Sequence, residues 1–110
     1  MLTAPTSKNM NAVAHVKAIR DGLPPALEWT ERDLSLLDLA EQQAADLDQL
    51  EADIADKGIR ISDVELNPAV MEARQARIAL GRLLGLVDIP AEASTRAIHA
   101  SKAAKARWAS

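Results

Sequence analysis

The stretch from Trp29 to Gly58 constrains the fold more than any other part of the chain. Thr30 and Asp33 have the spacing of a capping box, in which the threonine hydroxyl accepts a hydrogen bond from the backbone N–H three residues later. Apolar residues then recur at steps of three and four, which is typical of a helix that buries one face. Gly58 is suited to end this helix because glycine tolerates positive φ. We therefore predict a helix over residues 30–57, roughly 40 Å long.

The apolar face of this predicted helix is long and narrow, so it needs a partner helix from the same chain or from another copy. Two interpretations remain open. The first is a two-helix hairpin core. In the second, part of the face is an oligomer interface in which Gln43 helps to set the register. The candidate interface residues are Leu36, Leu39, Ala40, Gln43, Leu47, Leu50 and Ile54.

A second helix is predicted to begin at Asn67-Pro68. Asparagine is a favoured N-cap, and proline fits the first helical position because its missing N–H has no partner there. Gly85 is the expected C-terminal cap, which gives a helix over residues 67–85. Residues 59–66 alternate over short distances and predict an extended connection that reverses the chain. The two helices are thus expected to form a long antiparallel hairpin.

The segments on either side of the hairpin are expected to be helical arms. Residues 1–28 are interpreted as an N-terminal arm with a possible short helix over residues 9–21, which Pro24-Pro25 separates from the hairpin. Residues 89–110 are interpreted as an alanine-rich helical tail. The prediction is an all-α chain with an N-terminal arm (1–28), an oligomerisation core (29–88) and a C-terminal tail (89–110).

The composition argues against several classes of protein. The chain has no cysteine, which excludes disulfides and thiolate metal sites. No apolar run approaches the ~20 residues of a membrane span, and no signal peptide is evident, so we expect a soluble cytoplasmic protein that does not bind membranes. His15 and His99 lack the spacing of a metal site, and no glycine-rich phosphate loop is present. We predict a protein that is not an enzyme and uses no metal or cofactor.

Charge is distributed very unevenly along the chain. Residues 30–57 hold nine acidic residues against Arg32 and Lys57, a net charge of −7, whereas residues 93–110 hold four basic residues and no acid. Such a basic block suits a polyanion. Contact with a protein partner through Trp108, or a simple solubilising role, remains open for the tail. The candidate DNA-binding residues are Arg96, Lys102, Lys105 and Arg107, aided by Lys17 and Arg20.

The order of several short motifs resembles the phage terminase small subunits of the P27 type. These motifs are Leu66-Asn67-Pro68-Ala69-Val70, Glu72-Ala73-Arg74 and Leu83-Leu84-Gly85-Leu86, and the resemblance extends over residues 27–108. The opening Leu27-Glu28-Trp29-Thr30 and the basic tail also look like versions carried by phages and prophages of actinobacteria. The chain departs from the family after Leu86, where Val87-Asp88-Ile89-Pro90 replaces the common Thr-Pro-Ser and arginine.

This resemblance implies a non-catalytic partner of a DNA-packaging motor in the host bacterial cytoplasm. Such a protein binds double-stranded viral DNA, assembles into a homo-oligomer, usually a ring, and delivers the DNA to the large ATPase and nuclease subunit of the terminase. The alternative, from the residues alone, is a small helical interaction or regulatory adaptor, similar to an antitoxin, whose acidic helix docks on a basic protein.

Overall fold

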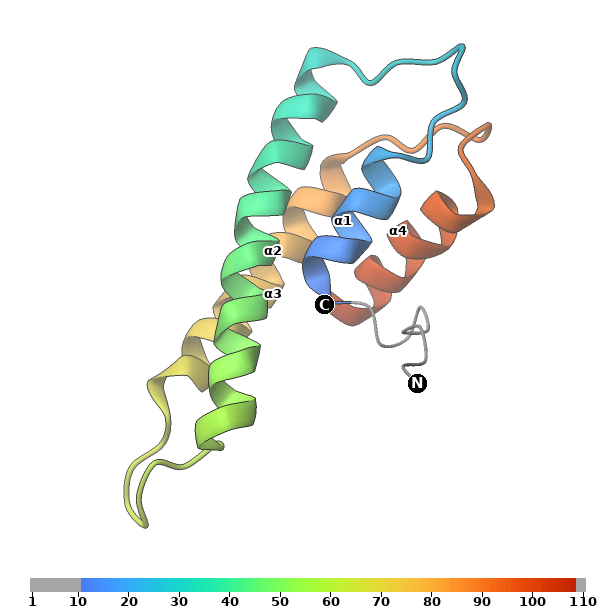
Figure 1. Cartoon of the computed structure of the whole chain (residues 1–110). Helices are drawn as coiled ribbons and strands as arrows, with labels where there is room; N and C mark the ends of the chain where they lie inside the picture. The colour runs from blue at the N-terminus through green and yellow to red at the C-terminus, as the bar shows by residue number, and fades with distance from the viewer. Residues whose placement is uncertain (1–10, 109–110) are drawn as a thin grey trace, which may run out of the picture.

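The computed structural model describes residues 11–108, apart from the side chains of residues 104, 105 and 108. All regular structure in this part of the chain is helical (Figure 1): α1 (Ala12–Arg20), α2 (Glu31–Lys57), α3 (Pro68–Leu86) and α4 (Thr95–Trp108). The predicted all-α class is therefore confirmed. Within the same residues, no helix is long and apolar enough to cross a membrane.

Helix α2 begins and ends close to the predicted residues. The Thr30 hydroxyl accepts a hydrogen bond from the Asp33 backbone N–H at 3.0 Å, as the capping-box spacing predicts. The Asp33 carboxylate accepts a hydrogen bond from the backbone N–H of Asp88 at 3.4 Å. At the other end Gly58 has φ +86°, a backbone conformation that favours glycine. Asp33 therefore ties the start of α2 to the segment after α3.

Helix α3 begins as predicted and ends slightly later. The Asn67 side chain caps it by accepting a hydrogen bond from the backbone N–H of Ala69 at 3.0 Å. The helix continues to Leu86, and Val87 is its C-cap. Gly85 thus lies inside the last turn, and the predicted cap at this glycine is wrong. No positive φ is needed at Gly85, because the backbone leaves the helix two residues later, at Val87, in an extended conformation.

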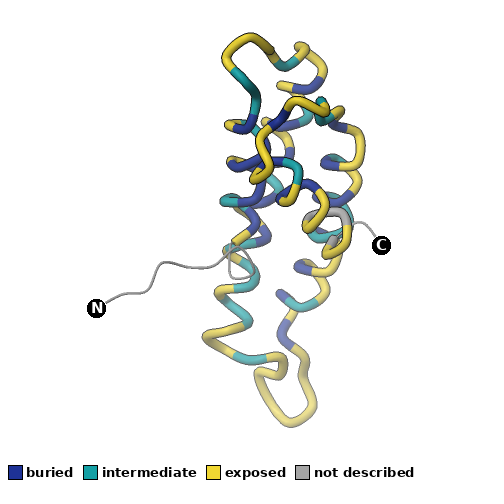
Figure 2. The backbone as a smooth tube through the Cα atoms, turned by 90° about the vertical axis from the view of Figure 1, so that its right-hand side faces the viewer, coloured by how far each residue is buried: buried dark blue, intermediate teal, exposed yellow. Residues whose placement is uncertain are grey.

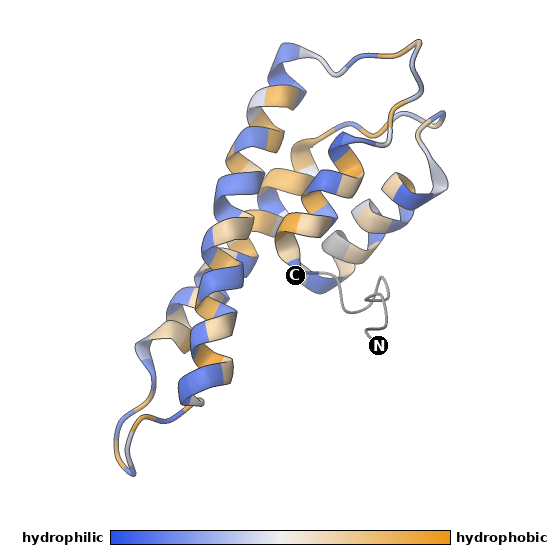
Figure 3. Ribbon diagram, in the orientation of Figure 1, coloured by the Kyte–Doolittle hydropathy of each residue, from blue (hydrophilic) through white to orange (hydrophobic). Residues whose placement is uncertain are grey.

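Helices α2 and α3 pack along one another, and the connection between them lies at one end of the molecule (Figure 1). Residues 59–66 form an isolated antiparallel bridge between Arg60 and Leu66 rather than a pair of strands. The apolar side chains of this connection are exposed, and the exposed fraction of Val64 reaches 93% (Figures 2 and 3). We call residues 59–66, with the adjoining turns of α2 and α3, the projecting end.

Helices α1 and α4 cover the other half of the α2–α3 pair. Helix α1 contacts α2 and α4, and α4 contacts α1 and α3, which creates a four-helix body. Its core is aliphatic, and the largest fully buried side chains are Val16, Ile19, Leu37, Leu47, Leu80 and Leu84. The terminal segments expected to be arms are thus part of the body, because α1 supplies large apolar groups and the alanines of α4 permit close packing.

The buried face of α2 differs from the apolar face formed by the candidate interface residues. Ala40 and Leu47 are fully buried, as that face requires, but so are Leu37 and Ala44, which the prediction omitted. Leu39, one of the candidate interface residues, is 51% exposed. The difference arises because two helices, α1 and α3, cover α2 from different sides, so the buried stripe is displaced from the one that a single partner would cover.

Candidate nucleic-acid interface

Helix α4, which carries most of the candidate DNA-binding residues, is anchored at its first turn. The Ser94 hydroxyl accepts from the backbone N–H of Ala97 at 3.1 Å, and the Ser94 N–H donates to the carbonyl of Gly22 at 2.7 Å. A Cβ at Gly22 would overlap the side chain of Ala97. Glycine is required at this point because α1 and α4 approach so closely.

The sequence of α4 separates its small residues from its basic ones. Ala97, Ala100 and Ser101 are buried against the body, whereas Arg96, Lys102 and Arg107 are exposed. Lys105 lies in the same helix, but its side chain is outside the described residues, so its predicted role stays a prediction. The helix thus presents cations to solvent while alanines hold it in place.

The exposed cations fall into two groups. Lys17 of α1 and Arg96 of α4 line the same hollow between these helices, which has a volume of about 290 Å³ and also includes Asp21. Lys102 instead lines a separate hollow of about 430 Å³, together with the segment that joins α3 to α4, including Asp88. The structure therefore brings Lys17 and Arg96 together and places Lys102 at the other side of α4.

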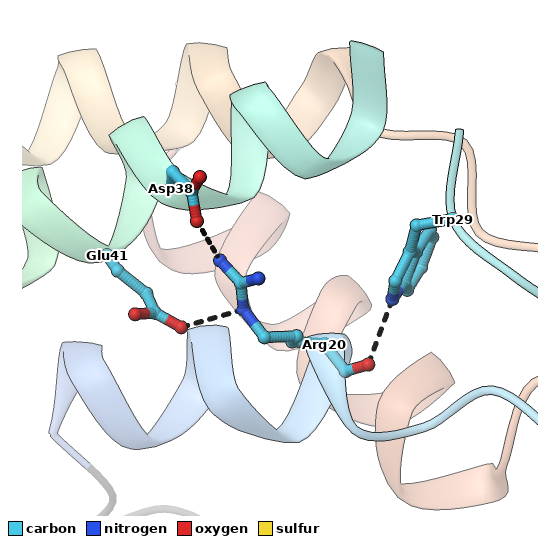
Figure 4. Close-up of polar contacts among 4 residues, drawn as sticks. All are labelled: Arg20, Trp29, Asp38 and Glu41. Carbon is cyan, nitrogen blue, oxygen red and sulfur yellow. Dashed lines mark hydrogen bonds and ion pairs between the residues drawn. The ribbon is translucent and has the colours of Figure 1, made fainter. Parts of the chain in front are cut away.

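Arg20, also predicted to contact DNA, is engaged inside the protein (Figure 4). Its Nε donates to Glu41 at 2.8 Å and its terminal nitrogen to Asp38 at 2.7 Å. Its carbonyl accepts from the indole of Trp29 at 2.9 Å. Burial lowers the pKa of Arg20, but the two carboxylates outweigh burial and raise the pKa above the ordinary value. In this structure the guanidinium holds α1 against α2, so DNA contact would require it to leave both acids.

His15 of α1 is buried and only 3% exposed. Burial, and secondly the charge of Arg107, lower the pKa of His15 below its ordinary value. The backbone of Ala100 and the carboxylate of Asp48 act in the opposite direction but do not overcome these effects. The surroundings of His15 in the fold therefore favour the uncharged imidazole over the charged one.

Asp48 has a role that local sequence patterns did not reveal. Its carboxylate, on α2, accepts hydrogen bonds from the backbone N–H groups of Ala12 at 2.8 Å and Val13 at 3.1 Å. Asn11 caps the same helix by accepting from Ala14 at 2.9 Å. A negative charge at the N-terminus of α1 is favourable both for the orphan N–H groups and for the helix dipole.

The acidic and basic parts of the molecule lie at opposite edges. Helix α2, at the left in Figure 1, and helix α4, at the right, are separated by α1 and α3, each of which contacts both. Of the acids that α2 directs toward the body, Asp38 and Glu41 bind Arg20 and Asp48 binds the N-terminus of α1. A polyanion that approaches α4 therefore meets cations before the acidic helix.

A second candidate surface is a groove between α2 and α3 with a volume of about 420 Å³, here called the α2–α3 groove. Two predicted interface residues, Leu39 and Gln43, line it. The full lining is Leu39, Gln42, Gln43, Asp46, Ala79, Arg82 and Leu83.

The other predicted interface residues lie elsewhere. Leu36, Leu50 and Ile54 pack partly buried against the core of the same chain. Ala40 and Leu47 are fully buried, so a second copy cannot reach them without opening the fold. The predicted interface thus divides into residues that hold this chain together and two that remain available to a partner.

Among residues 11–108 no three histidine, cysteine or acidic side chains are grouped as a metal site would require. Comparisons with protein-family models, with curated proteins and with solved structures found no match.

Proposed function

We propose that this chain is the small subunit of a phage DNA-packaging terminase. In this role it binds double-stranded viral DNA through α4 and the adjoining side of α1, forms a homo-oligomer, and delivers the DNA to the large ATPase and nuclease subunit. The resemblance of the ordered motifs in residues 27–108 suggests this family, and the charge distribution on the fold supports the DNA-binding part of the proposal.

The observation that carries the proposal is the separation of charge between α2 and α4. Phosphate contacts dominate the affinity of proteins for DNA, and they require cations that acids of the same protein do not neutralise. Lys17, Arg96 and Lys102 are exposed and have no ion-pair partner among the described residues. Arg20 contributes less than the sequence suggests, because Asp38 and Glu41 hold it.

Assembly strengthens weak binding by each copy. Three or four cations per chain neutralise only a few phosphates, but linked copies bind the same DNA with a much higher effective concentration. A homo-oligomer, in the proposed form a ring, therefore needs only a modest basic surface on each subunit.

The DNA-binding part can be tested with two charge-matched triple variants. The first carries Lys17→Gln, Arg96→Gln and Lys102→Gln. The control carries Arg32→Gln, Arg60→Gln and Arg74→Gln, which remove three exposed charges from other parts of the chain. Fluorescence anisotropy with double-stranded DNA between about 50 and 200 mM salt should show weaker binding for the first variant. Its salt slope should fall by about 0.9 for each lost phosphate contact. Equal losses in both variants would contradict the proposed surface.

The packaging role needs a separate experiment. A terminase large-subunit or portal gene beside the coding gene is expected, and the chain should co-purify with the product of that large-subunit gene. If the chain binds DNA but has no such partner, it is a DNA-binding protein that does not take part in packaging.

The acidic outer surface of α2 favours the alternative, an adaptor for a basic protein. Glu31, Asp46 and Asp56 are exposed there and have no ion-pair partner among the described residues. The adaptor would be favoured if the chain did not bind DNA and instead co-purified with a basic protein. Asp56→Arg or Glu31→Arg should then release that protein.

A further inference from the structure

The α2–α3 groove lies beside the side of α2 that binds α1. The α2 residues that bind α1 are Asp38, Glu41 and Asp48. At 100° per residue, Leu39 and Asp46 of the groove lie about 80° or more around α2 from these side chains, whereas Gln42 borders Asp38. This face of the α2–α3 pair is therefore open to a partner.

The apolar groups of the groove have the shapes of a knob and a hole. Leu39 is 51% exposed at the α2 wall. Ala79 and Leu83 line the opposite wall, one helical turn apart on α3, and the alanine leaves room for an incoming side chain. Leu86, one turn beyond Arg82 on the same side of α3, is also 51% exposed. Leucine inserted into such a hole is the usual unit of helix packing between chains.

The polar groups of the groove are complementary to themselves. Asp46 lies on the α2 wall and Arg82 on the α3 wall, and neither has an ion-pair partner within residues 11–108. Gln42 and Gln43 line the same groove from α2, and an amide both donates and accepts, so each can pair with the same group of another copy. A surface with one acid, one base and amides matches a second copy of itself turned by 180°.

We infer that the α2–α3 groove binds the same groove of a second copy through a two-fold axis. Each Leu39 enters the hole beside Ala79 of the other copy, and each Asp46 faces the partner's Arg82, so the ion pair forms twice. The inference rests on the assembly part of the proposed function and adds its surface and symmetry. A two-fold contact alone closes as a dimer, so a ring that uses this contact in every copy needs a second, different contact between dimers and has an even number of chains.

The test is a charge-swap series with matched controls. Asp46→Arg places two arginines together at each contact, Arg82→Asp places two acids together, and the double variant restores opposite charges. Asp56→Arg and Arg74→Asp make the same charge changes at exposed positions outside the groove. Sedimentation velocity and native mass spectrometry measure association, and thermal unfolding confirms that each variant remains folded.

The wild type should self-associate with an even number of copies at concentrations up to about 50 μM. Each single groove variant should weaken association about tenfold or more, the double variant should return to within about threefold of the wild type, and both controls should stay within about threefold. A monomeric wild type, an odd number of copies, single variants that match their controls, or a double variant that is not rescued would each overturn the inference.

DNA binding of the same proteins separates this inference from the proposed function. If the wild type assembles but the groove substitutions do not change the mass of the assembly, the groove inference is overturned and the packaging proposal stands. If the substitutions change association as predicted but the protein binds no DNA, the groove is established and the proposed function is overturned.

Discussion

The two ends of the α2–α3 pair share the same helices but are stabilised in different ways. At the end inside the body, Leu80 and Leu84 are almost completely buried, and burial of apolar area contributes about 25 cal/mol per Å². At the projecting end, Val64 and Leu66 remain largely exposed (Figure 2). The same helix pair therefore changes from a core to a surface along its length, according to whether other helices cover it.

Polar contacts hold the projecting end together. Asn67 donates to Asp53 at 3.2 Å and to the Gly58 carbonyl at 3.1 Å, and Lys57 pairs with Asp53 at 3.0 Å. Hydrogen bonds from Lys57, and secondly from Asn67, lower the pKa of Asp53. Exposed ion pairs contribute only about 0–1 kcal/mol each, so this end should open locally at a lower free energy than the body.

The largest expected effect comes from placing a charge in each region. Leu47→Asp buries an unpaired carboxylate in the body and should lower the free energy of unfolding by several kcal/mol, enough to unfold the chain. Leu66→Asp, at the projecting end, should change it by less than about 0.5 kcal/mol. Urea unfolding followed by circular dichroism measures both. Similar losses of unfolding free energy in Leu47→Asp and Leu66→Asp would show that the projecting end is covered in solution.

A matched pair of glycine substitutions comes next. Gly22→Ala introduces a methyl group that overlaps Ala97 and should destabilise the body by about 1–3 kcal/mol. Gly85→Ala meets nothing within 4 Å, and alanine favours the helix, so it should be neutral or stabilising by up to about 1 kcal/mol. Thermal unfolding compares them. A harmless Gly22→Ala would mean that α1 and α4 pack less closely.

At the projecting end, Asn67→Ala should cost about 1–2 kcal/mol, since it removes the α3 cap and the contacts to Asp53 and Gly58. Pro68→Ala should be nearly silent, because the first helical position needs no proline. Amide hydrogen exchange around residues 57–70 should increase in the first variant alone. A more damaging Pro68→Ala would contradict this account of the helix start.

The smallest expected effect is a pH dependence of the body. The pKa of His15 is lowered in the folded state, so the unfolded chain binds more protons near and below pH 6.5. The resulting loss of stability should begin as the pH falls through 6.5 and should be absent above it. Unfolding free energies measured between about pH 7.5 and 5.5 test the sign.

His15→Gln should flatten this dependence, whereas a substitution of the exposed His99 should leave it unchanged. An unchanged pH dependence in the His15 variant would remove this histidine as its cause.

Local features of the fold were predictable from the sequence. Thr30 and Asn67 cap their helices through side chains two or three residues from their partners, and such contacts depend on short-range geometry alone. The starts of α2 and α3 followed from these caps, and their helical character from the 3.6-residue period. The all-α class followed from that helical character.

Contacts between distant segments were not predictable. Leu37 and Ala44 were missed because a helical period shows that a stripe is buried without showing how many helices cover it. The packing of α4 was missed because its contacts use alanines, which give a weak hydrophobic signal, and a close approach at Gly22.

The candidate site was predicted in part for the same reason. The exposure of Arg96 and Lys102 follows from their positions among alanines on one helix. The meeting of Lys17 with Arg96, and the capture of Arg20 by Asp38 and Glu41, depend on tertiary packing.

The packing of α1 against α4 has a consequence for synthesis on the ribosome. Helix α1 emerges first, whereas α4, which packs against it, emerges only after α2 and α3 (Figure 1). The α2–α3 pair is local in sequence and can form earlier, and Asp48 can receive the N-terminus of α1 as soon as α2 is made. The body itself closes only after α4 has been made. Until then Val16 and Ile19 have an incomplete cover, so the nascent chain, rather than the finished protein, is the form most exposed to chaperones and proteases.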